Sequence, residues 1–186
     1  MGTFWSLLAP RRNRHERAGF ALYAAAVAAA RSPFLYRELG APDTIDGRFD
    51  LVGLYVFLLI DRLRRAAPPG PDLAQAVFDA MFSDMDVNLR EMGVGDLSVG
   101  KKVRTMWEAF HGRSVAYAAP LEAGDASALA AALARNVWRS VEPASEGAKR
   151  LARLAAAQRA FLSKQALEQL AAGKIEFLPA EAAACA

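Results

Sequence analysis

The sequence is poor in the residue types that form disulfides and thiolate metal sites. Its 186 residues include a single cysteine, Cys185, beside the C-terminus, and two histidines, His15 and His111. One cysteine cannot form an internal disulfide, and the two histidines lack the spacing of a zinc motif. We therefore expect a protein of a reducing compartment, with no metal and no cofactor.

The sequence also lacks a hydrophobic run long enough to cross a membrane. The strongest run extends from Leu51 to Ile60 and is bounded by Asp50 and Asp61. A spanning helix needs roughly 20 apolar residues, about twice this length. The sequence therefore predicts a cytoplasmic protein, with peripheral contact to the inner face of the cytoplasmic membrane as a further expectation.

Residues 1–12 are predicted to form a flexible or membrane-touching N-terminus. Phe4 and Trp5 precede Arg11 and Arg12. Apolar side chains beside cations can insert into an anionic membrane surface, so these four are the candidate membrane-contact residues. A frayed or core-docked N-terminus is the simpler interpretation, because chain ends are often poorly ordered.

Alanine is abundant and β-branched residues are sparse, which favours helices. No segment alternates with the period of a strand, and no two-residue hairpin turn is present. The sequence therefore predicts an all-α fold, a single compact domain of about six to seven helices. This helical domain is expected over residues 13–173, around a buried central helix at residues 48–65, with a last helix at 148–172 and a loose C-terminal tail at 174–186.

The segment from Met81 to Phe110 predicts two helices joined by a tight corner. Apolar residues of the first helix share one face when residues are placed 100° apart: Ala74, Phe78, Met81, Phe82, Met85, Leu89 and Met92. The second helix has a similar row and is expected to end near residue 118: Val99, Val103, Met106, Phe110 and Tyr117. Gly93 and Gly95 end the first helix, because glycine adopts the left-handed C-terminal cap without strain. Asp96 and Ser98 are candidate N-caps for the second.

Two motif-like patterns near this corner do not support catalysis. Gly95 to Lys102 has the spacing of a phosphate-binding loop, but Lys102 occupies the position where a hydroxyl should bind Mg²⁺. Asp84, Asp86 and Asn88 imitate the first ligands of a calcium loop, yet Gly95 stands where that loop needs glutamate. No catalytic residue is predicted, and the chain is not expected to be an enzyme.

Charged and polar residues are dense around a corner whose folding needs only caps and glycines. We therefore predict that they bind a partner: Asp84, Asp86, Asn88, Arg90, Glu91, Asp96, Lys101 and Lys102. Nearby methionines could adapt to varied partner shapes, although a core position is the simpler interpretation for each: Met81, Met85, Met92 and Met106. The net charge of +3 is mild and the basic residues are spread, so no specific nucleic-acid binding is expected.

Three segments resemble the ubiquinol–cytochrome c chaperone family. They are RSPFLY at residues 31–36, PDT at 42–44 with GRFDL at 47–51, and the long FDAMFSDMDVNLREMGVGDLSVGKK at 78–102. FHGR at 110–113 and Tyr117 also fit, and the resemblance covers roughly residues 14–140. Residues within these segments are second-tier partner-binding candidates, although the first three could equally cap and pair the central helix: Arg31, Arg48, Asp50 and Arg113.

The resemblance implies a non-catalytic assembly factor for the cytochrome bc1 complex. The Ala- and Arg-rich composition indicates a bacterial member. Mitochondrial members of the family bind newly made cytochrome b together with a small companion protein, near the ribosome at the inner membrane. Cytochrome b is therefore the expected client, and a companion protein and the ribosome are further expected partners.

Two other functions remain open from the residues alone. One is a membrane-surface helical adaptor for another client, acting through Phe4, Trp5 and the arginines that follow. The other is a small all-α enzyme with an unrecognised cofactor.

Overall fold

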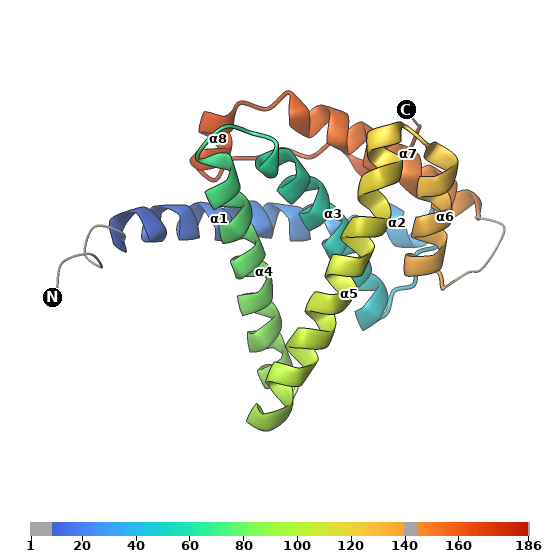
Figure 1. Ribbon diagram of the computed structural model, residues 1–186. Coiled ribbons are helices and arrows are strands. Elements are labelled where there is room, and N and C mark those ends of the chain that lie inside the picture. The colour runs from blue at the N-terminus through green and yellow to red at the C-terminus, as the bar shows by residue number, and fades with distance from the viewer. Residues whose placement is uncertain (1–8, 140–144, 186) are drawn as a thin grey trace, which may run out of the picture.

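The structure, a computed structural model, describes residues 9–139 and 145–185, with side chains described for 15–139 and 145–184. Those residues form helices without strands (Figure 1). The helices are α1 (Ala9–Ala30), α2 (Pro33–Arg37), α3 (Ile45–Arg64), α4 (Gly70–Glu91), α5 (Asp96–Ala123), α6 (Ala126–Val137), α7 (Glu146–Ser163), α8 (Leu167–Ala171) and α9 (Ala180–Cys185). The predicted all-α single domain is confirmed, with nine helices in the described residues where about six to seven were expected.

Helix α3 is the buried centre of the domain, as predicted. Every side chain from Leu51 to Ile60 is buried, because α1, α4, α5, α6 and α7 all pack against it. The helix begins at Ile45 rather than at residue 48. The Thr44 side chain accepts a hydrogen bond from the Gly47 backbone N–H at 3.1 Å, which caps the first turn.

Helices α4 and α5 form a V whose corner projects away from the other helices (Figure 1). At its open end α4 packs against α1 and α3, and α5 packs against α3 and α6. Gly19 allows α1 and α4 to approach closely, since a Cβ there would lie 2.6 Å from the backbone of Ala76. The V is therefore fixed to the body at its open end and leaves its corner free.

Two predicted helix ends were wrong. Helix α5 does not end near residue 118 but continues through Pro120 to Ala123, where Gly124 adopts a left-handed conformation with φ of 68°. The predicted last helix at 148–172 is divided into α7 and α8. Arg62 of α3 donates to the carbonyl oxygens of Leu162 (2.9 Å) and Gln165 (2.8 Å), which satisfies carbonyls at the end of α7.

The expectation of a loose tail at 174–186 is wrong for the residues described, 174–185. The buried Gln158 side chain donates to the Leu178 carbonyl at 2.7 Å and accepts from the Leu178 N–H at 3.0 Å. Gln165 makes the same pair of bonds to the backbone of Glu176, at 2.6 and 3.1 Å. Phe177 packs edge-on against Tyr55 of α3, with ring centroids 5.3 Å apart. The two glutamine side chains thus satisfy backbone N–H and C=O groups of this extended segment, as a neighbouring strand would. Helix α9, which follows the segment, packs against α7.

A buried carboxylate ties α5 to the centre. Asp50 of α3 forms ion pairs of 2.7 Å with Arg113 of α5 and with Arg139, which follows α6. Burial raises the pKa of the Asp50 carboxyl from 3.8 to about 6, because loss of hydration outweighs the opposing effect of the two guanidinium groups. The Tyr117 hydroxyl is also buried in this region of α5. The cluster therefore joins three elements at one end of α3.

The close contact between α1 and α4 yields a stability prediction. Gly19→Ala should lower the free energy of unfolding by about 1–3 kcal/mol, because the new methyl group collides with backbone that cannot turn away. Urea denaturation followed by circular dichroism measures this. Gly112→Ala is the matched control, since a Cβ at Gly112 meets nothing within 4 Å and should add about 0.5–1 kcal/mol. Equal effects of the two substitutions would contradict the close packing.

The Asp50 cluster yields a pH prediction. A folded-state pKa above the unfolded value means that the folded chain binds more protons between pH 3.8 and about 6. Its stabilising contribution is therefore complete below pH 3.8 and is lost as the pH rises through 6. Compared with Asp50→Asn, the wild type should lose unfolding free energy between pH 4 and 7, as measured by urea denaturation. A relative gain would instead show that Arg113 and Arg139 outweigh the cost of burial.

Candidate functional site

The corner between α4 and α5 is built by a backbone motif that the sequence predicts. Gly93 has φ of 81°, its N–H donates to the Arg90 carbonyl at 3.0 Å, and the Val94 N–H donates to the Leu89 carbonyl at 3.0 Å. This pair of bonds satisfies carbonyls at the end of α4, as in a Schellman cap. The predicted N-caps of α5 are wrong, because Gly95 occupies the N-cap position and Asp96 already belongs to the helix.

Five of the eight predicted partner-binding residues take part in hydrogen bonds or ion pairs at the corner. Arg90 forms an ion pair with Asp86, four residues before it, at 2.7 Å, and a second pair with Asp96 at the start of α5. The Asn88 side chain donates to the Asp84 carbonyl oxygen at 2.8 Å. The Arg90–Asp96 pair connects the end of α4 to the beginning of α5, whereas the other two contacts lie within α4, so these contacts have a structural role whatever else they do.

Asp84 connects the corner helix to the body. Its carboxylate accepts a hydrogen bond from the Tyr23 hydroxyl of α1 at 2.7 Å. Burial first, and then this bond to Asp84, raise the pKa of Tyr23, so the hydroxyl remains a donor. The interaction spans 61 positions in the chain, which is why helical spacing could not reveal it.

Three of the predicted residues are free to meet a partner. Glu91, Lys101 and Lys102 are exposed, and none makes an ion pair with another described residue. They lie on both sides of the corner, one anionic near the end of α4 and two cationic in α5. The predicted set is thus partly structural and partly available for binding.

Exposed apolar side chains accompany these charges. Leu97 is fully exposed at 101%, Met92 is 61% exposed and Val87 is 49% exposed. The placement of Met92 on the buried stripe was wrong, because that residue caps α4 after the helix has ended at Glu91. Sequence reasoning missed Leu97 and Val87. A signal existed for Leu97, since it lies 200° around the helix from Val99, the first residue of the inward row.

The inner faces of the V are apolar, as the stripes predict. Phe78, Phe82 and Phe110 form an aromatic cluster, with ring centroids 4.7 to 6.2 Å apart. Met81 is fully buried, which confirms its core position. Met85 and Met106 are intermediate in exposure, so the two helices are less completely covered toward the corner.

The second-tier candidates lie elsewhere and have structural partners. Arg48 pairs with Asp43 at 2.6 Å in the loop before α3, and Asp50 and Arg113 belong to the buried cluster. Arg31 is exposed, and no ion pair is seen for it among the described residues. These four residues do not extend the charged corner into one site.

The candidate membrane-contact residues are largely outside the description. Phe4 and Trp5 lie outside the described residues, and for Arg11 and Arg12 only the α1 backbone is described. Within residues 9–139 and 145–185, no helix has both the length and the hydropathy that a membrane span requires.

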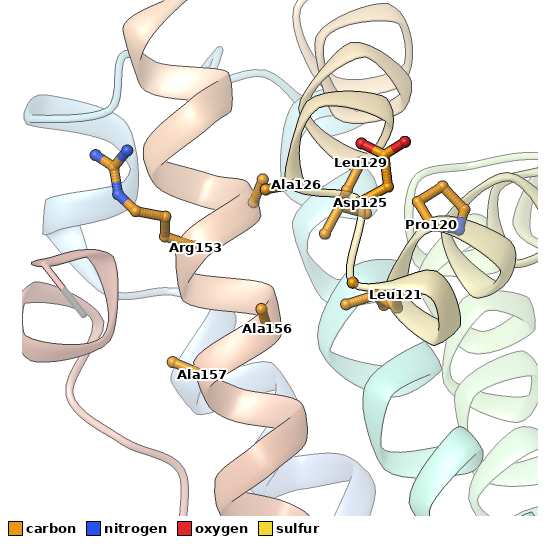
Figure 2. A pocket seen from close by; sticks show the side chains of 10 residues that line it. Pro120, Leu121, Asp125, Ala126, Leu129, Arg153, Ala156 and Ala157 are labelled. Atoms are coloured by element: carbon orange, nitrogen blue, oxygen red, sulfur yellow. The ribbon is translucent and has the colours of Figure 1, made fainter.

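A cavity of about 270 Å³ lies between α7 and the turn that joins α5 to α6 (Figure 2). Its lining is mainly apolar: Pro120, Leu121, Gly124, Asp125, Ala126, Leu129, Ala152, Arg153, Ala156 and Ala157. Asp125 is occupied as the N-cap of α6, accepting from the Ala128 N–H at 2.8 Å, and Arg153 donates to the Ala184 carbonyl at 3.3 Å. The two charged side chains of the lining, Asp125 and Arg153, are thus both engaged in bonds to the backbone. Over the residues that the structure describes, no three His, Cys, Asp or Glu side chains gather in a metal-binding group.

Comparison with known proteins gives consistent results. Residues 37–177 match the family model described as "Ubiquinol-cytochrome C chaperone". The chain is 24% identical over 102 residues to a Xenopus laevis protein named "Ubiquinol-cytochrome-c reductase complex assembly factor 1", a match that covers 55% of this chain and half of that protein.

A solved structure shares the fold. The crystal structure of the Cbp3 homolog from Brucella abortus superposes with a TM-score of 0.82 at 35% sequence identity, and the match covers 96% of this chain and 98% of that one. The residues that match the family model, 37–177, include the corner and the central helix alike. The chain therefore belongs to the ubiquinol–cytochrome c chaperone family.

Proposed function

We propose that this chain is a non-catalytic assembly factor that binds newly made cytochrome b and promotes assembly of the ubiquinol–cytochrome c reductase (bc1) complex. Membership of the chaperone family supports the assembly role. The Xenopus laevis relative carries the same role in its name, and the chain spans about half the length of that relative. The cavity between α7 and the α5–α6 turn has a mainly apolar lining whose two charged side chains, Asp125 and Arg153, already bond the backbone, which favours binding over catalysis.

The observation that carries the proposal is the exposed apolar surface at the projecting corner. Leu97 and Met92 lie in water at the point of the V, although burying a side chain of this size is worth about 1.5–3 kcal/mol. A chaperone for a membrane protein must cover apolar surface and later release it. Two or three such side chains supply a modest, reversible affinity, while the V behind them keeps its shape.

The unpaired charges around this apolar surface would orient a partner as it binds. Lys101 and Lys102 lie on one side and Glu91 on the other, and rim charges of this kind steer encounter and select partners. The proposed binding surface therefore consists of Glu91, Met92, Leu97, Lys101 and Lys102, with Asp84, Asp86, Asn88, Arg90 and Asp96 holding the corner in place. A companion protein and the ribosome are further proposed partners, and we place the work at the inner face of the cytoplasmic membrane.

This division of roles determines which variant tests the proposal. Asp86 is a poor probe, because its reversal also breaks the ion pair with Arg90, and an exposed pair of this type contributes about 0.2–1 kcal/mol. Lys101 and Lys102 have no ionic partner among the described residues. Their reversal should change binding and leave the fold intact.

We expect Lys101→Glu combined with Lys102→Glu to weaken cytochrome b capture about tenfold, which corresponds to about 1.4 kcal/mol. In a strain that lacks the gene and is complemented with this variant, the b- and c1-haem signals in reduced-minus-oxidised spectra of membranes should fall. The circular dichroism spectrum and melting temperature should match the wild type.

Lys164→Glu with Lys174→Glu is the matched control, since it changes the net charge equally at exposed positions far along the chain. It should restore the haem signals fully. Normal b- and c1-haem signals in the deletion strain itself would refute the assembly role and favour the membrane-surface adaptor.

A further inference from the structure

The C-terminal residues return from α8 along α7 (Figure 1). Side chains of α7 and of the turn that follows it contact them in antiparallel order: Gln165 at Glu176, Gln158 at Leu178 and Arg153 at Ala184. We call residues 175–184 the C-terminal strap. The strap begins as an extended segment and ends in α9.

The two glutamines hold the strap by its backbone. Each side-chain amide donates to the carbonyl oxygen and accepts from the N–H of one and the same residue, at 2.6 to 3.1 Å. The two residues held, Glu176 and Leu178, are two positions apart, so their backbone groups lie on one edge of an extended chain. Phe177 lies between them and packs against Tyr55. Any extended peptide carries these backbone groups, so the site reads the extended form and one aromatic position.

Apolar burial holds the strap only weakly. The side chains of the strap that are buried are alanines: Ala180, Ala183 and Ala184. The larger apolar side chains are only partly buried: Ile175, Phe177 and Leu178. Neither Glu176 nor Glu181 forms an ion pair with another described residue. Because the hydrophobic gain scales with apolar area and a helix as short as α9 is not stable alone, we expect the strap to open before the domain unfolds.

The groove under the strap is apolar and has one buried amide. Helical spacing places three leucines on the same side of α7 as Gln158, and each is at most 1% exposed: Leu151, Leu154 and Leu162. Opening of the strap leaves this row less covered and removes both backbone partners of Gln158, which is itself 0% exposed. An unpaired buried amide is costly, so the open groove favours another extended chain that supplies the same two bonds.

We infer that the groove beneath the C-terminal strap binds an extended apolar segment of the client, which takes the place of the strap. The strap itself shows the chemistry that fits: backbone groups bonded at alternate residues, with an aromatic side chain between them against Tyr55. A membrane protein that has not finished folding offers such segments. The inference rests on the proposed function, in which the client is cytochrome b, and adds a second surface whose access the strap controls.

A fluorescently labelled peptide with the sequence of residues 175–184 tests the exchange on the full chain. We expect weak saturable binding to the wild type in fluorescence polarisation, because the tethered strap competes at a high effective concentration. Phe177→Ala in the chain weakens that competitor, so it should tighten peptide binding about tenfold. The same substitution in the peptide should weaken binding about tenfold, since it removes the aromatic anchor.

Val77→Ala is the matched control, because it truncates a fully buried side chain of α4 outside the groove. It should lower the melting temperature and leave peptide affinity unchanged. If neither the wild type nor Phe177→Ala binds the peptide, the inference is overturned. The same holds if Val77→Ala tightens binding as much as Phe177→Ala, since general destabilisation would then explain both.

Hydrogen exchange measures the opening of the strap without any ligand. The backbone N–H groups of Glu176 and Leu178 should exchange about a hundredfold faster than that of Leu58 in the centre of α3, because local opening needs less free energy than global unfolding. Equal rates would mean that the strap opens only when the whole domain unfolds, which overturns the inference.

Capture of cytochrome b connects the groove to the client. An excess of the unlabelled peptide should lower co-purification of cytochrome b with the tagged full chain from detergent-solubilised membranes, about fivefold at a peptide concentration four times its dissociation constant. The Phe177→Ala peptide at the same concentration should have a much smaller effect.

The remaining outcomes separate the inference from the proposed function. If Lys101→Glu with Lys102→Glu weakens capture while the peptide changes nothing, the inference is overturned and the proposed function stands. If the wild-type chain captures no cytochrome b, the two fall together. If light scattering shows a dimer that the peptide dissociates, the strap exchanges between two copies of this chain and the inference is overturned.

Discussion

Complete burial of the central helix is the constraint on which the rest of the structure depends. Every side chain from Leu51 to Ile60 is enclosed, so helices must surround α3 on all sides. Five of the described helices of this 186-residue chain contact α3 and so provide this enclosure. The ends of α4 and α5 that meet at the corner extend beyond this enclosed core, and Val87, Met92 and Leu97 are exposed there in the part of the chain that the structure describes (Figure 1).

At the corner, five of the eight predicted partner-binding residues are engaged in contacts within the chain. Asp84 accepts a hydrogen bond from Tyr23, and Asp86 and Asp96 form ion pairs with Arg90. These interactions stiffen a hairpin that has little core of its own. A stiff hairpin can present Leu97 and Met92 to water without collapsing onto them. The role of the free charges in binding a partner stays a prediction, whereas the structural role of the paired ones is visible in their contacts.

Polar side chains of α7 and of the turn that follows it determine how the C-terminal residues are held. Gln158 and Gln165 bind the extended backbone at Leu178 and Glu176, and this places Phe177 against Tyr55. At the other end of the core, Asp50 gathers Arg113 and Arg139 from two further elements. In both places a polar group buried in an apolar surrounding is satisfied by chain that is distant in sequence, as the cost of burying it unpaired requires.

The sequence by itself determined the all-helical class, the burial of α3 and the glycine corner. Each of these depends on short-range features, namely a continuous apolar run between Asp50 and Asp61 and the left-handed cap at Gly93. The sequence of residues 78–102 also indicated the family. Only the tertiary structure decided that Met92 is exposed, that residues 174–185 are packed, and that Asp84 is already bonded. The reason is physical. Helical spacing tells which residues share a face of a helix. Whether that face is buried, and which groups its polar residues pair with, depends on the elements packed against it, and these elements come from distant parts of the chain.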